Sequence, residues 1–312
     1  MTSIVQSGRP SQGAISRRTF SIGFASMVGF GMFEGMERAN ATPVTAADCH
    51  AHIFKRGLKL AESRRYAPDY DAPLEAYLQN LDANGLSHGV AVQPSFLGTD
   101  NSYLLEGLSA AKGRLRGIVV VDPSIPVAEL KSLDERGVAG IRLNLAGQPI
   151  PPFDAEPWPE FLKQIAKLGW QVEVQRDAKD LAAILPILLK AGVTVVCDHF
   201  GKPDSKLGVN DPGFRALLDA GAKKPVWAKI SGFYRIGKGE EAKANALAAY
   251  PMLRDAFGLE HLVWGSDWPH TQFEKDVNYA EARQFLNVLV PNEKERAQIL
   301  GANAAKLFRF AA

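Results

Sequence analysis

A short segment of small and polar residues, which ends in two histidines, reads Thr45-Ala-Ala-Asp48-Cys-His50-Ala-His52. A short run of this kind, placed before a helical pattern, predicts a buried strand. Side chains of a strand alternate between its two faces, so Asp48, His50 and His52 are expected on one face and Cys49 on the other. The carboxyl end of this strand would therefore present two imidazoles side by side.

Seven further strand-like runs follow, separated by helix-length segments. The eight predicted strands cover residues 45–52, 89–93, 116–121, 138–144, 170–175, 194–199, 226–231 and 261–267. Helical patterns, with apolar residues three and four positions apart, include 73–84, 158–168, 180–191 and 278–290. Several of them stop at a glycine such as Gly85, Gly169 or Gly192, the residue that favours helix ends.

This alternation predicts a single (β/α)8 barrel of the TIM type, an α/β fold with a parallel sheet. An open sheet that binds a dinucleotide would carry a Gly-x-Gly-x-x-Gly turn after its first strand, and the sequence has none there. No repeat of about 20 to 50 residues appears beyond the β/α alternation, so a solenoid or a propeller is not indicated.

The composition agrees with one globular domain and narrows the partners. Hydrophobic residues make up 46% of the 312 positions and charged residues 22%, as in proteins that bury a core. The 36 Lys and Arg against 34 Asp and Glu give a net charge of +2 without a basic block, so nucleic acid is not an expected partner. Two cysteines, Cys49 and Cys197, are too few for a disulfide scaffold and are expected in the core. The sequence leaves open whether the chain forms a homo-oligomer.

The first 41 residues are typical of an export signal. Arg17-Arg18 precede a weakly hydrophobic stretch over residues 20–33, and Ala39-Asn-Ala41 follows as a cleavage site. Together these features resemble a twin-arginine signal. We therefore expect a cleavable signal over 1–41, a mature barrel domain over 42–312 and a periplasmic location. The apolar stretch is shorter than the ~20 residues that a bilayer requires, so no membrane span is expected in the mature protein.

Histidine and aspartate side chains stand at the carboxyl ends of three of the predicted strands. The active site of a (β/α)8 barrel lies at the carboxyl ends of its strands. There the first strand places His50 and His52, the sixth places His199 and the eighth places Asp267. Each residue alone has a structural explanation, such as a hydrogen bond in the core or a helix cap, but together at one end of the barrel they indicate a common catalytic site.

Cations and neutral polar residues are expected at the same end. Arg142 lies on the fourth predicted strand, Lys202 follows the sixth and Arg235 follows the seventh. An isolated Arg or Lys is usually a solvated charge, but three at one barrel mouth suggest a clamp for a carboxylate or sulfonate. Ser95 and Asn101 could add neutral hydrogen bonds to the same ligand.

Six polar motifs occur in order along the chain: Asp48-Cys-His50-Ala-His52, Gln93-Pro-Ser95 with Gly98-Thr-Asp-Asn101, Gly140-Ile-Arg142-Leu-Asn144, Asp198-His199-Phe-Gly201-Lys-Pro203, Gly265-Ser-Asp267-Trp-Pro269 and Asn303-Ala-Ala-Lys-Leu-Phe308. This series resembles the amidohydrolase superfamily, and within it the branch of 2-pyrone-4,6-dicarboxylate lactonases. The resemblance covers nearly all of the predicted mature chain. It implies a barrel hydrolase with a place in aromatic-compound catabolism.

The resemblance also bears on the metal. Metal-dependent members bind a cation through the His pair of the first strand, a His at the end of the fifth strand and the Asp of the eighth. Here Gln175 occupies the position at the end of the fifth strand, and an amide is a poor zinc ligand. We therefore favour a site without a cofactor, in which Gln175 binds substrate; the alternative is a single zinc ion on His50, His52 and Asp267.

The reaction that the resemblance implies is the opening of a small anionic lactone by water. Asp267 would act as general base, with its pKa raised toward the working pH by burial. His50, His52 and His199 would polarise the ring carbonyl and stabilise the oxyanion. The substrate would be a 2-pyrone-4,6-dicarboxylate-like or muconolactone-type ring, with or without a sulfonate.

Two other functions stay open at this stage. A sugar-acid (aldarate) lactone isomerase would use the same residues to move an acyl group between two hydroxyls of one molecule. A non-catalytic periplasmic solute-binding protein would bind the anion without turnover.

Overall fold

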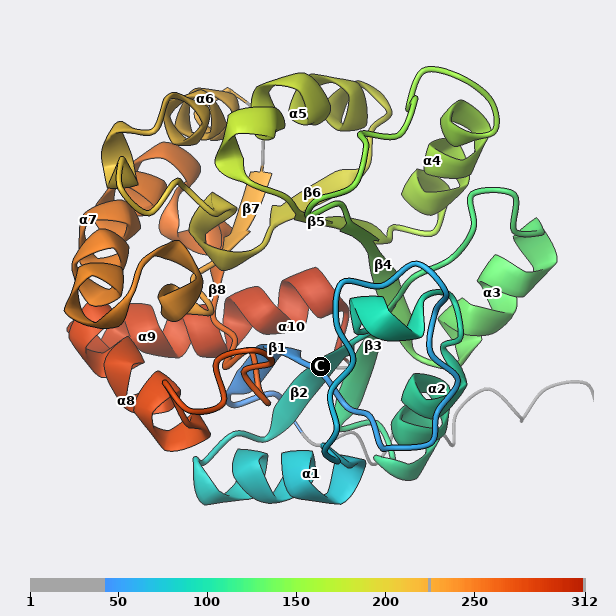
Figure 1. The fold of residues 1–312 in the computed structure, drawn as a ribbon, viewed down its shortest axis with the longest axis horizontal. Helices are drawn as coiled ribbons and strands as arrows, with labels where there is room; N and C mark the ends of the chain where they lie inside the picture. Colours follow the sequence, from blue (N-terminus) through green and yellow to red (C-terminus); the bar gives the residue numbers. More distant parts are fainter. Residues whose placement is uncertain (1–42, 224–225, 311–312) are drawn as a thin grey trace, which may run out of the picture. The chain divides into compact units, whose positions relative to one another are not determined.

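The eight predicted strands all form, and they pair in chain order as neighbours in one parallel sheet (Figure 1). The computed structural model describes residues 43–223 and 226–310, so the predicted export signal over 1–41 lies outside the described residues. The strands are β1 Ala47–Ala51, β2 His88–Val92, β3 Leu115–Val119, β4 Val138–Asn144, β5 Gln171–Gln175, β6 Thr194–Cys197, β7 Val226–Lys229 and β8 Leu262–Val263. Most end before the predicted residue, because the chain turns there into the loops that carry the polar side chains.

Backbone hydrogen bonds between β1 and the segment after β8 close the sheet into a barrel. The Cys49 N–H donates to the Trp264 carbonyl over 2.8 Å, and the Asp267 N–H donates to the His50 carbonyl over 2.7 Å. The pairing thus continues beyond the two residues of β8. This closure confirms the predicted barrel and brings Asp267 beside the histidines of β1.

Ten helices, with short 3-10 turns between some of them, occupy the described part of the chain. They are α1 Leu74–Ala83, α2 Ser102–Ala110, α3 Val127–Glu135, α4 Trp158–Lys167, α5 Leu181–Lys190, α6 Pro212–Gly221, α7 Gly239–Phe257, α8 Tyr279–Leu289, α9 Glu293–Leu300 and α10 Ala302–Phe308. Four of them, α1, α4, α5 and α8, agree with the predicted bounds to within one residue at each end. In α4 the buried Phe161, Leu162 and Ile165 form the three-and-four pattern that faces the sheet. None of the helices in this part is long and apolar enough to cross a membrane.

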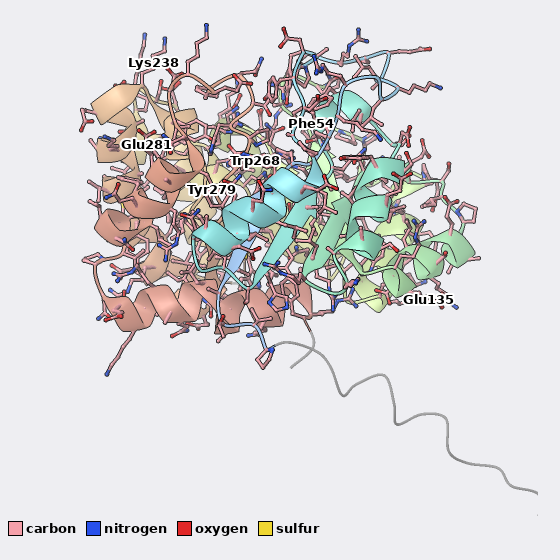
Figure 2. The ribbon with its side chains drawn as sticks, turned by 90° about the horizontal axis from the view of Figure 1, so that it is seen from below. Phe54, Glu135, Lys238, Trp268, Tyr279 and Glu281 are labelled. Atoms are coloured by element: carbon pink, nitrogen blue, oxygen red, sulfur yellow. The ribbon has the colours of Figure 1, made fainter. Side chains whose placement is uncertain are left out.

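An apolar cluster fills the barrel at the amino-terminal end of its strands. Residues from seven strands contribute to it, and Ala304, Leu307 and Phe308 of α10 pack against them from the amino-terminal end. Figure 2 shows the barrel from the side: Phe54 and Lys238 lie toward one end, whereas Glu135 lies toward the other. Because Phe54 follows β1 and Lys238 follows β7, the end opposite α10 is the one where the strands finish. The polar residues gather at that end.

The predicted orientation of Asp48 and Cys49 is wrong. Cys49 packs in the interior cluster with Val90 and Val92 instead of facing the helices. The Asp48 carboxylate lies on the outer face, where Ser266 Oγ donates to it over 2.6 Å and Tyr279 Oη over 2.9 Å. Both Cys49 and Cys197 are buried free thiols, as predicted.

An irregularity in β1 explains this difference. The pairing with β2 shifts register between Asp48 and Ala51, and such a bulge interrupts the strict alternation of side chains. As a result His50 and His52 point into the barrel although Asp48 points out. A sequence pattern with a period of two cannot show the shift.

Candidate active site

A cavity of about 210 Å³ opens at the carboxyl ends of the strands. Eight of the ten side chains predicted from the sequence line it: His52, Ser95, Arg142, Gln175, His199, Lys202, Arg235 and Asp267. The sequence did not indicate four further lining residues, Arg65, Tyr66, Gln272 and Phe273. His50 and Asn101 are the two predicted residues outside this lining.

Asp267 follows β8 and is completely buried. Its Oδ2 atom accepts hydrogen bonds from Tyr234 Oη, over 2.7 Å, and from Arg235 Nε. Its Oδ1 atom has no hydrogen-bond partner among the described residues. A buried carboxylate oxygen without a partner is costly, and this atom is the one available to a ligand in the cavity.

The pKa of Asp267 departs from the expectation. Burial pushes it upward, but Arg235, His199 and His50 push it down, and the resulting pKa lies well below the ordinary value of 3.8. The predicted rise of the Asp267 pKa toward the working pH therefore does not occur in this arrangement of side chains. Asp267 is an anion held by a neighbouring guanidinium.

His52 is fixed in one tautomer by its backbone contact. Its Nδ1 atom lies 2.7 Å from the Val92 carbonyl oxygen, which can only accept, so Nδ1 carries the hydrogen. Burial, followed by Arg142, lowers the pKa of His52 to about 3, and the ring is neutral. Its Nε2 atom is therefore an acceptor, 3.7 Å from Asp267 Oδ1. This corrects the expected role of His52, because a lone pair cannot polarise a carbonyl.

His50 lies deeper than the cavity wall and is completely buried. Its Nε2 atom is 3.7 Å from Asp267 Oδ1. Its Nδ1 atom is 3.0 Å from Lys229 Nζ and 3.4 Å from Asp198 Oδ1. Burial and the Lys229 charge lower the pKa of His50 well below its ordinary value, so this imidazole is also neutral.

His199 begins the short 3-10 turn η3 His199–Gly201 after β6. Its Nδ1 atom lies 3.0 Å from Ser231 Oγ, and its ring centroid lies 5.0 Å from that of His50. Burial lowers the pKa of His199 to about 4. Both His199 and Asp267 have a positive φ, 52° and 61°, a region that few residues other than glycine adopt. The backbone is thus turned sharply at two site residues.

The three predicted cations all reach the cavity, but each is paired with a carboxylate. Arg142 Nε donates to Asp198 Oδ2 over 3.1 Å, and Lys202 Nζ lies 2.8 Å from Asp177 Oδ1. Arg235 holds Asp267. Each cation thus already forms an ion pair with a carboxylate of the chain. An anionic ligand would have to bind these cations alongside those carboxylates.

The neutral residues divide between the cavity and the loops. Ser95 and Gln175 line the cavity, and Gln175 Oε1 is buried without a hydrogen-bond partner within the described part of the chain. Asn101 bonds to backbone instead: its Oδ1 accepts from the Val120 N–H over 3.1 Å, and its Nδ2 donates to the Val120 carbonyl over 2.8 Å. The structure does not bring Asn101 to the cavity, because it fixes the loop that follows β3.

Sequence reasoning missed the charged residues beneath the cavity. Lys229 on β7 and Glu173 on β5 are both fully buried, with Lys229 Nζ 2.6 Å from Glu173 Oε1. Burial raises the pKa of Glu173 to about 7, although Lys229 lowers it. The available signal was a charge next to buried apolar residues: Lys229 ends the otherwise apolar strand β7, and Glu173 stands between two valines of β5. Tyr234, which contacts Asp267, had none.

Two groups of side chains have the spacing of metal ligands. They are His50, His52 and Asp267, and His50, Asp198 and His199, with ligand atoms within 4.8 Å of one another in each group. The first is the predicted zinc set. Arg142 Nη2 lies 3.5 Å from His50 Nε2 and Arg235 holds Asp267, so cations already border that set.

These features define a class of protein, a (β/α)8 barrel with a polar, cation-lined cavity where its strands finish. The sequence profile of one family, described as amidohydrolase, matches residues 47–310. The chain therefore belongs to the amidohydrolase family, which confirms the resemblance of its motifs.

Relatives cover nearly the whole chain. It is 30% identical over 274 residues to the 4-sulfomuconolactone hydrolase of Rhizobium radiobacter. The aligned residues cover 86% of this chain and 91% of that protein. It is 29% identical over 277 residues to the 2-pyrone-4,6-dicarboxylate hydrolase of Comamonas testosteroni, 85% and 90% of the two chains. A solved structure from Pseudomonas putida, described as a candidate 2-pyrone-4,6-dicarboxylic acid hydrolase, is 45% identical with a TM-score of 0.82, covering 87% and 100%.

More distant relatives bear on the alternatives. The D-galactarolactone isomerase of Agrobacterium fabrum is 24% identical over 274 residues, 86% of this chain and 92% of that protein. An amidohydrolase structure from Burkholderia multivorans with bound zinc has a TM-score of 0.72 at 21% identity, covering 85% and 99% of the two chains. At this identity the second similarity shows the shared fold alone.

Gly232 offers a test of the site geometry. A Cβ atom there would lie 2.8 Å from both Asp267 Oδ2 and His199 Nδ1, at a φ of +56°. Gly169 has a φ of +64° but open space around the same position. Alanine carries about 1–2 kcal/mol of left-handed strain at either residue. We expect Gly232→Ala to lower the free energy of unfolding by about 1–3 kcal/mol more than Gly169→Ala does, because it also displaces buried side chains. Denaturant titration measures both, and equal losses would contradict this packing.

Proposed function

We propose that this protein is a lactonase that opens the ring of a small anionic lactone by adding water. The observation that carries the proposal is the unpaired Oδ1 atom of Asp267, which faces the acceptor nitrogen of His52 in a cavity lined by cations. The lactone hydrolases among its relatives support the same reaction. We take 2-pyrone-4,6-dicarboxylate and 4-sulfomuconolactone as the substrate class.

Asp267 and His52 together would orient the attacking water. Asp267 Oδ1 and His52 Nε2 lie 3.7 Å apart and both accept hydrogen bonds. A water between them would donate its two hydrogens to these atoms, and its lone pair would then face the carbonyl carbon of a bound lactone. Asp267 would take one proton as the new carbon–oxygen bond forms, which is general base catalysis.

Substrate binding would raise the basicity of Asp267. The guanidinium of Arg235 lowers the pKa of this carboxyl and also lines the cavity. A carboxylate or sulfonate of the substrate near Arg235 would offset that positive charge, and the pKa of Asp267 would rise. The base would therefore strengthen only when the correct anion is present.

His199 and Arg142 would stabilise the charge that forms on the carbonyl oxygen. Both line the cavity and both can donate hydrogen bonds. Donors held in place before the reaction are worth several kcal/mol to such an oxyanion. The ring carbon–oxygen bond then breaks, and the leaving oxygen takes up a proton to complete the hydrolysis.

The remaining cavity residues would recognise the acid groups of the substrate. Arg65 and Lys202 add two cations to Arg142 and Arg235, while Ser95 and Gln175 offer neutral hydrogen bonds. Arginine binds planar oxyanions through two parallel hydrogen bonds, whereas Lys202 acts as a point charge. Because a point charge does not require a planar partner, Lys202 could bind either a carboxylate or a sulfonate.

We further propose that the reaction needs no metal. Two cations, Arg142 and Arg235, contact residues of the three-ligand set, and a divalent ion would have to sit between them. Gln175 stands at the end of β5 as a weak ligand. The alternative is a mononuclear zinc held by His50, His52 and Asp267, where the ion would supply an activated water.

Isomerisation is the second candidate reaction. The D-galactarolactone isomerase among the relatives supports it, and the same carboxylate could remove a proton from a substrate hydroxyl instead of from water. The two reactions differ in their products. Hydrolysis incorporates one oxygen atom from labelled water into the product and releases acid, whereas isomerisation does neither. A solute-binding protein would bind the same anion and convert none of it.

Asp267→Asn tests the role of the base. With 2-pyrone-4,6-dicarboxylate or 4-sulfomuconolactone as substrate, we expect kcat to fall at least ~100-fold while binding measured by calorimetry persists, because the amide keeps the shape but cannot take a proton. Asp276→Asn, an exposed change, serves as the matched control and should keep the wild-type rate. Hydrolysis at the wild-type rate by Asp267→Asn would exclude this carboxylate as the base.

Chelation separates the two accounts of water activation. Purified protein should contain less than one metal ion per site by elemental analysis, and its lactonase rate should be unchanged after dialysis against a chelator. The physical reason is that Asp267 and His52 themselves orient the water. Activity that disappears on chelation and returns with zinc would contradict the metal-free proposal.

We also propose that the protein is exported to the bacterial periplasm, on the evidence of its first 41 residues. Expressed in a bacterium with a twin-arginine pathway, the mature chain should begin at Thr42 and appear in the periplasmic fraction. Replacement of Arg17 and Arg18 by lysine should keep the full-length chain in the cytoplasm, because the pathway reads the arginine pair. An uncleaved wild-type chain in the cytoplasm would exclude export.

A further inference from the structure

A buried lysine lies directly behind the proposed active site. Lys229, the last residue of β7, is completely buried, and its Nζ atom lies 3.0 Å from His50 Nδ1. The same atom lies 2.6 Å from Glu173 Oε1 and 3.6 Å from Asp198 Oδ1. The lysine is therefore surrounded by one imidazole and two carboxylates, on the far side of His50 from the cavity.

We propose that Lys229 is a positioning residue that selects the tautomer of His50. Its ammonium group donates a hydrogen bond to Nδ1, so that Nε2 carries the ring hydrogen and presents it to Asp267 Oδ1. This inference rests on the proposed function only for its catalytic consequence. The tautomer itself is a property of the resting protein.

The hydrogens that each group can donate decide the tautomer of His50. An ammonium group has three hydrogens to donate and no lone pair. At 3.0 Å from Lys229 Nζ, His50 Nδ1 can only be an acceptor, because two N–H groups cannot face each other at that distance. Two other contacts compete with this arrangement. Asp198 Oδ1, an acceptor, is 3.4 Å from Nδ1, and Arg142 Nη2, a donor, is 3.5 Å from Nε2; both are longer than the 3.0 Å contact with Lys229. A hydrogen bond between a nitrogen and a carboxylate is normally about 2.7–2.9 Å, so the lysine holds the better position.

The two histidines of β1 then meet Asp267 in opposite tautomers. His52 presents a lone pair because the Val92 carbonyl takes its Nδ1 hydrogen, whereas His50 presents an N–H because Lys229 takes its Nδ1 lone pair. Both Nε2 atoms are 3.7 Å from the same oxygen, Asp267 Oδ1. Donor and acceptor around one carboxylate oxygen orient a water molecule in a single way. If His50 Nε2 were an acceptor like His52 Nε2, the water molecule could donate its hydrogens to different pairs of acceptors, and its orientation would not be fixed.

The buried ion pair of Lys229 and Glu173 is not an effective source of stability. This also indicates that Lys229 has a role in the site. Replacing a buried ion pair by apolar residues of similar size is often neutral or stabilising. Lys229 and Glu173 are both fully buried inside the barrel, and the residues next to each of them along its own strand are apolar. A lysine at the end of β7 does, however, donate a hydrogen bond to His50 Nδ1, and an apolar side chain cannot do this.

Nitrogen NMR on the intact protein tests the tautomer without any substrate. In protein labelled with 15N in its histidines, long-range proton–nitrogen correlations distinguish a protonated ring nitrogen from an unprotonated one, and His50→Gln identifies the His50 signals by their loss. We expect His50 to carry its hydrogen on Nε2 and His52 to carry it on Nδ1. Finding the His50 hydrogen on Nδ1 in the wild-type protein overturns the proposal.

Variants of the buried pair test the cause. Lys229→Met alone leaves Glu173 unpaired, so the double variant Glu173→Gln/Lys229→Met is made beside it. In both variants we expect the His50 hydrogen to move to Nδ1, where Asp198 becomes its partner. Glu173→Gln alone keeps the lysine and should keep the wild-type tautomer. A wild-type tautomer in the folded double variant overturns the proposal.

Kinetics then separate positioning from a structural role. With 2-pyrone-4,6-dicarboxylate as substrate, we expect kcat of the double variant to fall at least ~100-fold with KM within about threefold, because the substrate contacts remain while the reacting groups are misaligned. An unchanged kcat with a changed tautomer overturns the catalytic part of the proposal. If the wild-type protein converts no lactone yet shows His50 with its hydrogen on Nε2, the proposed function fails and the assignment of Lys229 stands.

Discussion

The closure of the barrel between β1 and the segment after β8 is the constraint on which the rest of the structure depends. Residues more than 200 positions apart are joined there by backbone hydrogen bonds, including the bond from the Asp267 N–H to the His50 carbonyl. Asp48 reinforces the closure, because its carboxylate accepts hydrogen bonds from Ser266 and Tyr279. The catalytic carboxylate that we propose and the imidazoles beside it are thus held by the same pairing that completes the sheet.

The second organising feature is a balance of buried charge around His50. Arg142, Lys229 and Arg235 contribute three positive charges, and Glu173, Asp198 and Asp267 contribute three carboxylates, linked by the ion pairs described above. In a dry interior each charge requires a partner. Burial, with the neighbouring cations, lowers the pKa of the three imidazoles, and Arg235 keeps the pKa of Asp267 well below its ordinary value. An anionic substrate that enters the cavity would disturb the balance at Arg235, and we propose that this disturbance activates the base.

Much of the fold and part of the site could be predicted from local patterns. The strands and helices followed from apolar spacing, and β4 agrees with its predicted range residue for residue. His52, His199 and Asp267 were found because polar residues after apolar strands meet at one end of a barrel. Asn101 was misplaced because an amide near the mouth can bond to a loop as readily as to a ligand. Lys229 was missed because its partners come from β1, β5 and the end of β6, which no local pattern connects.

By itself the sequence determined the class of fold, the strand order and the residue types that gather where the strands finish, since these depend on periodicity and on the direction of parallel strands. Only the tertiary structure decided the face of Asp48 and Cys49, the pKa of Asp267 and the tautomers of His50 and His52. Those properties arise from contacts between distant segments: a shift of register in β1, a guanidinium beside a carboxylate, a carbonyl or an ammonium beside a ring nitrogen. Hydrogen bonds and charges act over a few ångströms in space, and the order of residues along the chain does not reveal those distances.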